Sequence, residues 1–299
     1  MITYTQAIIL GLLQGVTELF PISSLGHSII IPGLLGWNLN MNGAEMLEFL
    51  VATHFATALV LFLFYWKDWM RIIGAFFRSL GNWNLVSSSD GAGGDAYAKL
   101  AWLLIIGTIP AGAIGLAFNK KLEALFTDPR SAALFLGLNG ILLFAAEMTR
   151  RRALKARPQA QQQQQEETLA GGDARIARLG WWQSFKVGLM QVLSLIPGIS
   201  RTGSTFAGSL WTGLSHEDSL RFSFLLATPV IGGAALLELP KLAHGGHALI
   251  AVSCTGAIAA AIAAYCSVKF LVRWFKTRTL LPFAAYCLAM GILGLIILR

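Results

Sequence analysis

Polar side chains near the start of this largely apolar chain have the types and the spacing for acid–base chemistry. Gln14 and Glu18 are four residues apart, so a helix places both on one face. Ser24 and His27 are three apart on the segment after Pro21, which ends the first helix. A hydroxyl beside an imidazole can serve as nucleophile and base, or as a pair that orients a phosphate and protonates a leaving oxygen. The structural alternatives are a hydrogen-bonded glutamate, capping serines and a packed histidine.

A second polar segment reads Pro197-Gly-Ile-Ser-Arg-Thr-Gly-Ser204. Its glycines allow the backbone to approach a ligand closely, and Ser200 can cap the helix that follows. The N-terminus of that helix offers free N–H groups to an anion, and the Arg201 guanidinium matches phosphate oxygens. The structural alternative is a salt bridge, most simply between Arg201 and Glu18. The segment therefore predicts an anion-binding turn.

The two polar segments belong to two copies of one duplicated unit. Residues 5–28 reappear, loosely rewritten, as residues 182–205, and residues 49–54 are echoed by residues 224–229. The copies agree in their scaffold residues and differ at polar positions. In a membrane protein, such paired broken segments are the first place to look for a binding site.

The chemistry is divided between the copies. One supplies an acid, a base and a hydroxyl, whereas the other supplies a cation and an anion-binding turn. That division suits one composite site that binds and cleaves phosphate. The candidate catalytic residues are Glu18, Ser24, His27 and Arg201, and the candidate substrate-binding residues are Gln14, Ser23, Gly26, Gly198, Ser200, Thr202 and Gly203.

The elements that must position these residues are membrane helices. The chain is 55% apolar and 13% charged, whereas soluble domains are about 25% charged. A β-barrel would show short alternating segments instead of long apolar ones. The first apolar run lacks a basic leader and contains Glu18, so we expect no cleaved signal peptide. Six segments have the length of a membrane span: 46–65, 100–118, 131–148, 219–237, 248–268 and 280–298.

The net charge of +8 could indicate nucleic-acid binding, but the distribution of the cations indicates membrane topology instead. Most lysines and arginines lie in three loops, within residues 67–99, 150–178 and 269–278. The positive-inside rule makes these loops cytoplasmic. Both chain ends then lie outside, and we expect no nucleic-acid partner.

This topology predicts an all-α membrane protein with an inverted repeat. Each copy contributes three spans, so the copies have opposite orientation, and segments 5–36 and 182–213 enter as re-entrant hairpins from opposite faces. The first repeat covers residues 1–149 and the second covers residues 181–299. Residues 150–180 are rich in Gln, Gly and charge, and they predict a flexible cytoplasmic linker.

The chain resembles the undecaprenyl-diphosphate phosphatase family, also known as the bacitracin-resistance proteins. The resemblance covers essentially the full length outside the linker and rests on residues 14–18, 21–27, 197–203 and 222–229. It implies hydrolysis of the terminal phosphate of a C55 isoprenyl diphosphate at the outer face of the bacterial inner membrane. It also implies dependence on Mg²⁺ or Ca²⁺.

The same resemblance implies roles for particular residues. Gln14 and Glu18 match the family's E/Q-xxx-E motif, which makes them the candidate metal ligands. Two positions depart from the family pattern: Leu25 stands where threonine is common, and Thr202 where serine is common. Neither departure removes a residue expected to be essential. The other functional positions of the family are matched by Ser24, His27, Ser200 and Arg201.

We expect Ser24 to be the nucleophile and His27 its base, with Arg201 and the Ser200 turn holding phosphate. Attack by a water that a metal ion activates is the open alternative. The rival function is a lipid-phosphate transporter or flippase that uses the same cavity, but simple anion transport has little use for a base beside a hydroxyl. A third hypothesis, that the protein is a scaffold subunit without chemistry of its own, leaves the buried charges unexplained. Membrane lipids are expected partners, and the oligomeric state is left open, a homodimer included.

Overall fold

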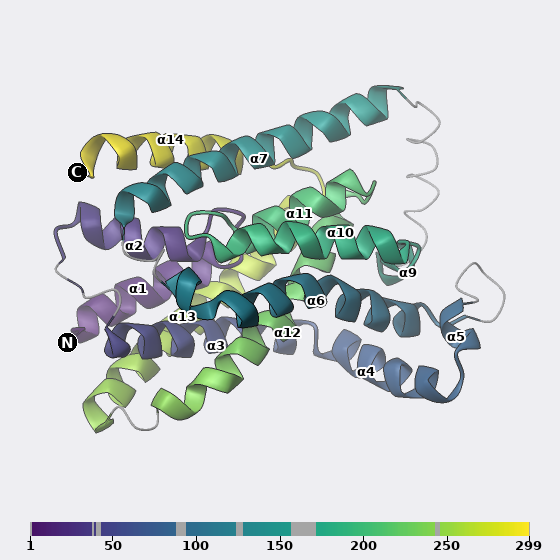
Figure 1. The fold of residues 1–299 in the computed structure, drawn as a ribbon, viewed down its shortest axis with the longest axis horizontal. Coiled ribbons are helices and arrows are strands. Elements are labelled where there is room, and N and C mark those ends of the chain that lie inside the picture. Colours follow the sequence, from purple (N-terminus) through teal and green to yellow (C-terminus); the bar gives the residue numbers. More distant parts are fainter. Residues whose placement is uncertain are drawn as a thin grey trace.

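The computed structural model describes residues 2–37, 39, 43–87, 94–123, 128–156, 172–242 and 246–298. Over these ranges the chain forms helices and no strand, as the composition predicts. The long helices run side by side along the long dimension of the molecule (Figure 1). Five of them are long and apolar enough to cross a membrane. The chain is thus an all-helical, multi-pass membrane protein.

The long helices coincide with the apolar segments of the sequence. The sixth predicted segment is α14 (Leu281–Ile297), which is apolar but has only 17 residues. A span usually needs about 20 residues, so α14 is short for one. The five longer helices are α3 (Ala44–Phe64), α6 (Ala96–Glu123), α7 (Pro129–Ala156), α12 (His216–Leu242) and α13 (Gly246–Trp274).

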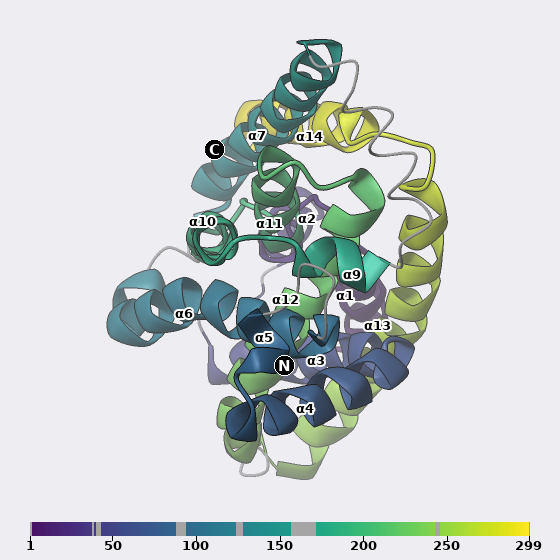
Figure 2. The ribbon, with the colours of Figure 1, turned by 90° about the vertical axis from the view of Figure 1, so that its right-hand side faces the viewer.

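Both predicted hairpin segments are broken helices. In the first, α1 (Tyr4–Thr17) and α2 (Ser24–Leu34) flank a bend. In the second, α10 (Trp181–Val192) is followed by the short 3₁₀ turn η2 (Leu193–Leu195) and then by α11 (Arg201–Trp211). Viewed along the bundle, α2 and α11 lie in its interior, between the pair α7 and α14 and the helix α3 (Figure 2).

Each broken helix packs along a long helix from the other half of the chain. α1 packs on α13, and α10 packs on α6. Glycine meets glycine at both crossings. A Cβ on Gly11 would lie 2.2 Å from the Gly256 carbonyl oxygen, and one on Gly188 would lie 2.4 Å from that of Gly107. Only glycine allows so close an approach. Because Gly11 aligns with Gly188 in the duplication, the two halves use the same contact.

The sequence did not predict α4 (Trp66–Gly81), which follows α3 after a break at Tyr65 and is itself followed by the short α5 (Asn84–Ser87). Charged residues interrupt its apolar face, so the sequence of this helix contains no uninterrupted apolar segment of span length. One face packs toward α6, and the opposite face carries exposed apolar side chains at helical spacing. These exposed side chains are Trp66, Met70, Ile73, Phe77 and Leu80.

The expected flexible linker 150–180 is helical at both ends. α7 continues to Ala156, and α9 covers Gly172–Ala177; residues 157–171 lie outside the described residues. Ion pairs explain the order of α9. Asp173 accepts two hydrogen bonds from Arg221, of 2.7 and 2.9 Å, and Arg175 donates two of 2.7 Å to Asp218. These pairs attach α9 to the start of α12.

Candidate active site

The first bend places a carboxylate beside a strained serine. Glu18 directly follows α1 and is buried. Ser23 caps α2, since its Oγ accepts a hydrogen bond of 3.2 Å from the Gly26 N–H. Its backbone has a φ of 69°, the one positive φ outside glycine among the residues that the structure describes. The bend is therefore held in a conformation that costs energy.

The second bend is capped in the same manner. Ser200 Oγ accepts a hydrogen bond of 3.0 Å from the Gly203 N–H, so the predicted cap of α11 is confirmed. Gly198 has a φ of 103°, and a Cβ there would lie 2.3 Å from the Ala132 carbonyl oxygen of α7. Glycine is needed here because the bend approaches α7 closely. The sequence did not predict this approach.

The two bends interlock. Thr202 Oγ1 donates to the Glu18 carbonyl at 3.1 Å, across the two halves of the chain. A Cβ on Gly26 would lie 3.0 Å from Gly198 Cα, so the bends touch without intervening side chains. Asn139 of α7 lies between them. Its Nδ2 donates to the Pro21 carbonyl at 2.9 Å.

Asn139 also binds the second bend, because its Oδ1 accepts from the Ser200 N–H at 3.1 Å. One buried amide thus satisfies backbone groups of both bends. No motif or spacing in the sequence singles out Asn139. Its signal was an asparagine within an apolar segment, since a buried polar group needs partners.

Glu18 is the centre of the site. Its carboxylate accepts hydrogen bonds from Ser24 Oγ and from the Arg201 guanidinium, and one of 3.0 Å from Gln14 Nε2. His54 Nε2 of α3 lies 3.3 Å from Glu18 Oε2. The ion pair with Arg201 is the structural alternative that the sequence left open. It pairs the buried carboxylate with the half-buried guanidinium, and either charge alone would be costly.

His27 does not contact Ser24 in the way that the sequence predicted. Its Nδ1 lies 2.7 Å from the Ser23 carbonyl oxygen, and its Nε2 lies 2.9 Å from Tyr286 Oη of α14. Ser24 is the first residue of α2 and binds back to Glu18, whereas the imidazole extends toward α14. The hydroxyl is therefore paired with a carboxylate instead of an imidazole.

A buried carboxylate that joins a serine hydroxyl to a guanidinium can hold a proton and an anion at one place. Comparison with known proteins agrees with that chemistry. Residues 7–293 match the family described as bacitracin resistance protein BacA. The chain belongs to this family.

Similar proteins extend over nearly the whole chain. The protein named "Undecaprenyl-diphosphatase" from Mycolicibacterium paratuberculosis is 42% identical and covers 97% of this chain and 95% of its own length. "Undecaprenyl-diphosphatase 2" from Frankia alni is 41% identical over 98% of this chain and 97% of its own. The protein of that name from Chromobacterium violaceum is 38% identical over 97% of both chains.

A divalent cation, which the resemblance implies, has two oxygen-bearing side chains available. Gln14 Oε1 is buried without a hydrogen-bond partner, although Gln14 Nε2 donates to Glu18. Within the described ranges no three His, Cys, Asp or Glu side chains form a metal-binding group. Gln14 and Glu18 thus fit an ion such as Mg²⁺, which commonly keeps waters and completes its shell with substrate phosphate oxygens.

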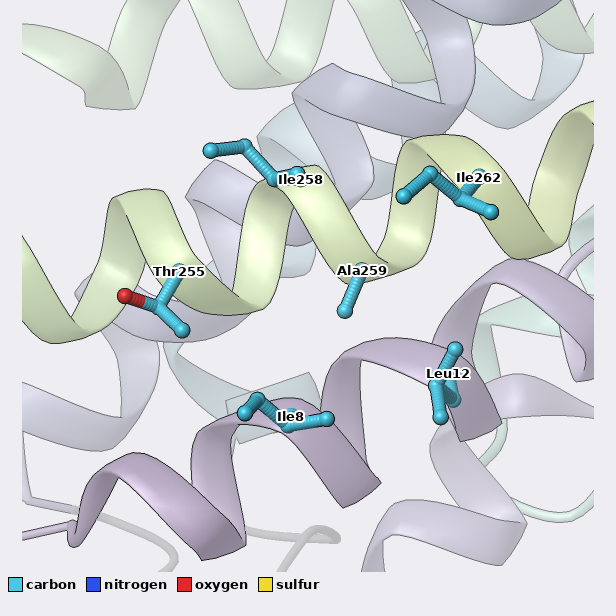
Figure 3. A pocket seen from close by; sticks show the side chains of 6 residues that line it. All are labelled: Ile8, Leu12, Thr255, Ile258, Ala259 and Ile262. Carbon is cyan, nitrogen blue, oxygen red and sulfur yellow. The ribbon is translucent and has the colours of Figure 1, made fainter.

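An apolar groove lies apart from this cluster, between α1 and α13. Figure 3 shows Ile8 and Leu12 of α1 facing the side chains of α13. The one hydroxyl in the groove, on Thr255, donates within its own helix to the Ala251 carbonyl at 2.9 Å. No candidate site residue lines the groove, whose surface suits apolar chains only. The other lining residues are Ile258, Ala259 and Ile262.

Proposed function

We propose that the protein hydrolyses undecaprenyl diphosphate to undecaprenyl phosphate and inorganic phosphate, which recycles a carrier lipid for cell-wall synthesis. The observation that carries the proposal is the buried carboxylate of Glu18 in contact with both Ser24 Oγ and the Arg201 guanidinium. Family membership and the names of the similar proteins support it. The rival transporter function would not need a hydroxyl hydrogen-bonded to a carboxylate.

The proposed chemistry begins with an exchange of partners at Arg201. An incoming diphosphate would draw the guanidinium and the N-terminus of α11 onto its oxygens. Glu18 would then lose its strongest counter-charge and become a better base for the Ser24 hydroxyl. Binding of the anion and activation of the hydroxyl are thereby coupled through one carboxylate.

Ser24 Oγ would then attack the terminal phosphorus while its proton passes to Glu18. The Oγ–P bond forms, the bridging P–O bond breaks, and undecaprenyl phosphate leaves with the bridging oxygen. Water then cleaves the serine phosphate, which releases inorganic phosphate and restores the hydroxyl. Positioning and charge neutralisation supply most of the rate enhancement in reactions of this kind. Direct attack by water, with Glu18 as the base, is the alternative.

A Mg²⁺ or Ca²⁺ ion, when bound, would neutralise charge on the diphosphate. Gln14 Oε1 and a Glu18 oxygen would hold it, since the amide oxygen is buried without another partner. Chelation should therefore abolish phosphate release, and added Mg²⁺ or Ca²⁺ should restore it. The same assay with Gln14→Leu should require more cation for half-maximal rate.

For the membrane arrangement we propose two inverted repeats, residues 1–149 and 181–299, joined through residues 150–180. α14 would be the sixth span, and the broken helices α1–α2 and α10–α11 would be re-entrant hairpins. The matching glycine contacts of α1 with α13 and of α10 with α6 support this arrangement. In a bacterial inner membrane, the site would open to the outer face and both chain ends would lie outside.

The test of function is phosphate release by the purified protein from farnesyl or undecaprenyl diphosphate. Arg201→Ala and Glu18→Ala should each lower the rate at least about a hundredfold, the scale for losing one charge-stabilising group. Rates are to be normalised to folded protein, and Thr255→Val in the apolar groove serves as the control. Full activity in both variants would exclude the composite site. Lipid-phosphate translocation in vesicles without phosphate release would favour the transporter.

A further inference from the structure

His27 is fully buried, and both of its ring nitrogens are engaged. Nδ1 lies 2.7 Å from the Ser23 carbonyl oxygen, which only accepts hydrogen bonds, so the proton of a neutral ring belongs on Nδ1. Nε2 then accepts the Tyr286 hydroxyl proton across 2.9 Å. The two rings also stack, with centroids 5.6 Å apart and an interplanar angle of 9°. His27 is therefore enclosed by protein on both sides.

The carbonyl that His27 holds belongs to the strained residue of the first bend. A non-glycine residue at φ 69° persists only where its surroundings impose that conformation. Three contacts hold Ser23: the Gly26 N–H on its side chain, and the His27 backbone N–H, at 3.3 Å, together with His27 Nδ1–H on its carbonyl. The Nδ1–H bond, at 2.7 Å, is the shorter of the two on the carbonyl. The next residue, Ser24, donates to Glu18. The direction of the Ser24 hydroxyl thus depends on the conformation of Ser23.

We infer that Tyr286 is a positioning residue for the reaction. The Ser23 carbonyl sets the His27 tautomer in which Nδ1 carries the proton, and the Tyr286 hydroxyl donates to Nε2 and holds the ring in that tautomer and orientation. Nδ1–H in turn holds the strained Ser23, and Ser23 directs Ser24 toward Glu18. The inference rests on the proposed function, and it gives α14 a direct connection to the first bend. Tyr286 is 40% exposed, so its hydroxyl contact, and not burial of the residue, links it to the site.

The first test is Tyr286→Phe, which removes the hydroxyl and keeps the stacked ring. We expect kcat to fall about tenfold, the effect of one ordinary hydrogen bond, with KM changed less than about twofold. KM is spared because Arg201, which would bind the diphosphate, is untouched. The matched control is Tyr265→Phe on α13, an exposed tyrosine outside the site, which should leave both constants unchanged. A kcat within about twofold of wild type in Tyr286→Phe would overturn the inference.

A second test separates positioning from proton transfer by His27. In His27→Asn, the amide N–H can replace Nδ1–H on the Ser23 carbonyl, but nothing replaces Nε2. We expect His27→Asn to keep activity similar to that of Tyr286→Phe, and His27→Leu to lose at least about a hundredfold. Adding Tyr286→Phe to His27→Asn should cost nothing more, because the shared contact is already absent. If His27→Asn is as inactive as His27→Leu while its thermal unfolding is unchanged, the inference is wrong.

A third measurement does not depend on activity. Nitrogen NMR of ring-labelled histidine in detergent-solubilised protein should show the His27 proton on Nδ1, with the signal identified by its loss in His27→Asn. Tyr286→Phe should shift the Nε2 resonance. A proton on Nε2 would overturn the inference even if phosphate is released normally. Absence of phosphate release in the wild type would instead refute the proposed function and leave the tautomer result standing.

Discussion

At the scale of single residues, the site is organised around one carboxylate. Glu18 joins the serine of the first bend to the arginine of the second, and Gln14 and His54 contact it from other sides. A carboxylate with so many donors is held rigidly, and its charge is neutralised inside the protein. Stability and catalysis therefore depend on the same group, and mutations must be chosen to separate them.

The double variant Glu18→Gln/Arg201→Gln separates these two roles. Glu18→Gln alone leaves the half-buried guanidinium unpaired, and breaking a buried pair costs about 3–5 kcal/mol. Replacing both partners by amides removes that penalty. We expect thermal unfolding of the single variant to occur at a clearly lower temperature, and the double variant to recover most of the loss while remaining inactive. Recovery of phosphate release in the double variant would show that the pair is structural only.

Ser24→Ala distinguishes the two possible nucleophiles. If the serine oxygen forms the bond to phosphorus, its removal should lower phosphate release at least about a thousandfold. If water attacks directly, the alanine variant should lose only about tenfold, the value of one hydrogen bond. Rapid quenching of the wild type, followed by mass analysis of the peptide that contains Ser24, should detect a phosphoserine in the first case alone.

At the scale of elements, the glycine crossings determine how closely the broken helices pack. Gly188→Ala would place a methyl group against the Gly107 backbone, which cannot move as a side chain can. We expect it to destabilise the protein by about 1–3 kcal/mol, the usual cost of overpacking. Gly112→Ala on α6 is the control, because a Cβ there meets nothing within 4 Å. It should be neutral or slightly stabilising in thermal unfolding, since alanine favours a helix.

The elements themselves were largely predictable from the sequence, whereas their partners were not. Long apolar segments have to become helices in a membrane, and prolines and serines mark the bends. α4 was missed because charges interrupt its apolar face. Asn139 and Tyr286 reach the first bend from helices more than a hundred residues away along the chain, and no spacing rule links such distant positions. The His27 contacts were wrongly predicted because spacing places two side chains near each other without fixing where each points.

At the scale of the whole molecule, the inverted arrangement makes a prediction about two equivalent connections. Arg130 follows α6 at the start of α7, and Lys276 follows α13 just before α14, so each lies after the corresponding helix of its own copy. Inverted copies must place these two positions on opposite sides of the membrane. The clustering of cations around residues 269–278 puts Lys276 in the cytoplasm, and Arg130 should then lie outside.

This opposite placement can be tested with a single cysteine at each of the two exposed positions. Labelling of each cysteine by a membrane-impermeant thiol reagent is measured on intact cells. Cys254 and Cys266 are exposed on α13 and are to be replaced by alanine first, whereas buried Cys287 can remain as an unreactive internal control. We expect Arg130→Cys to react in intact cells and Lys276→Cys to react only after permeabilisation. Reaction of both from the same side would mean that the copies are parallel, and two broken helices entering from one face could not form the proposed hairpin pair.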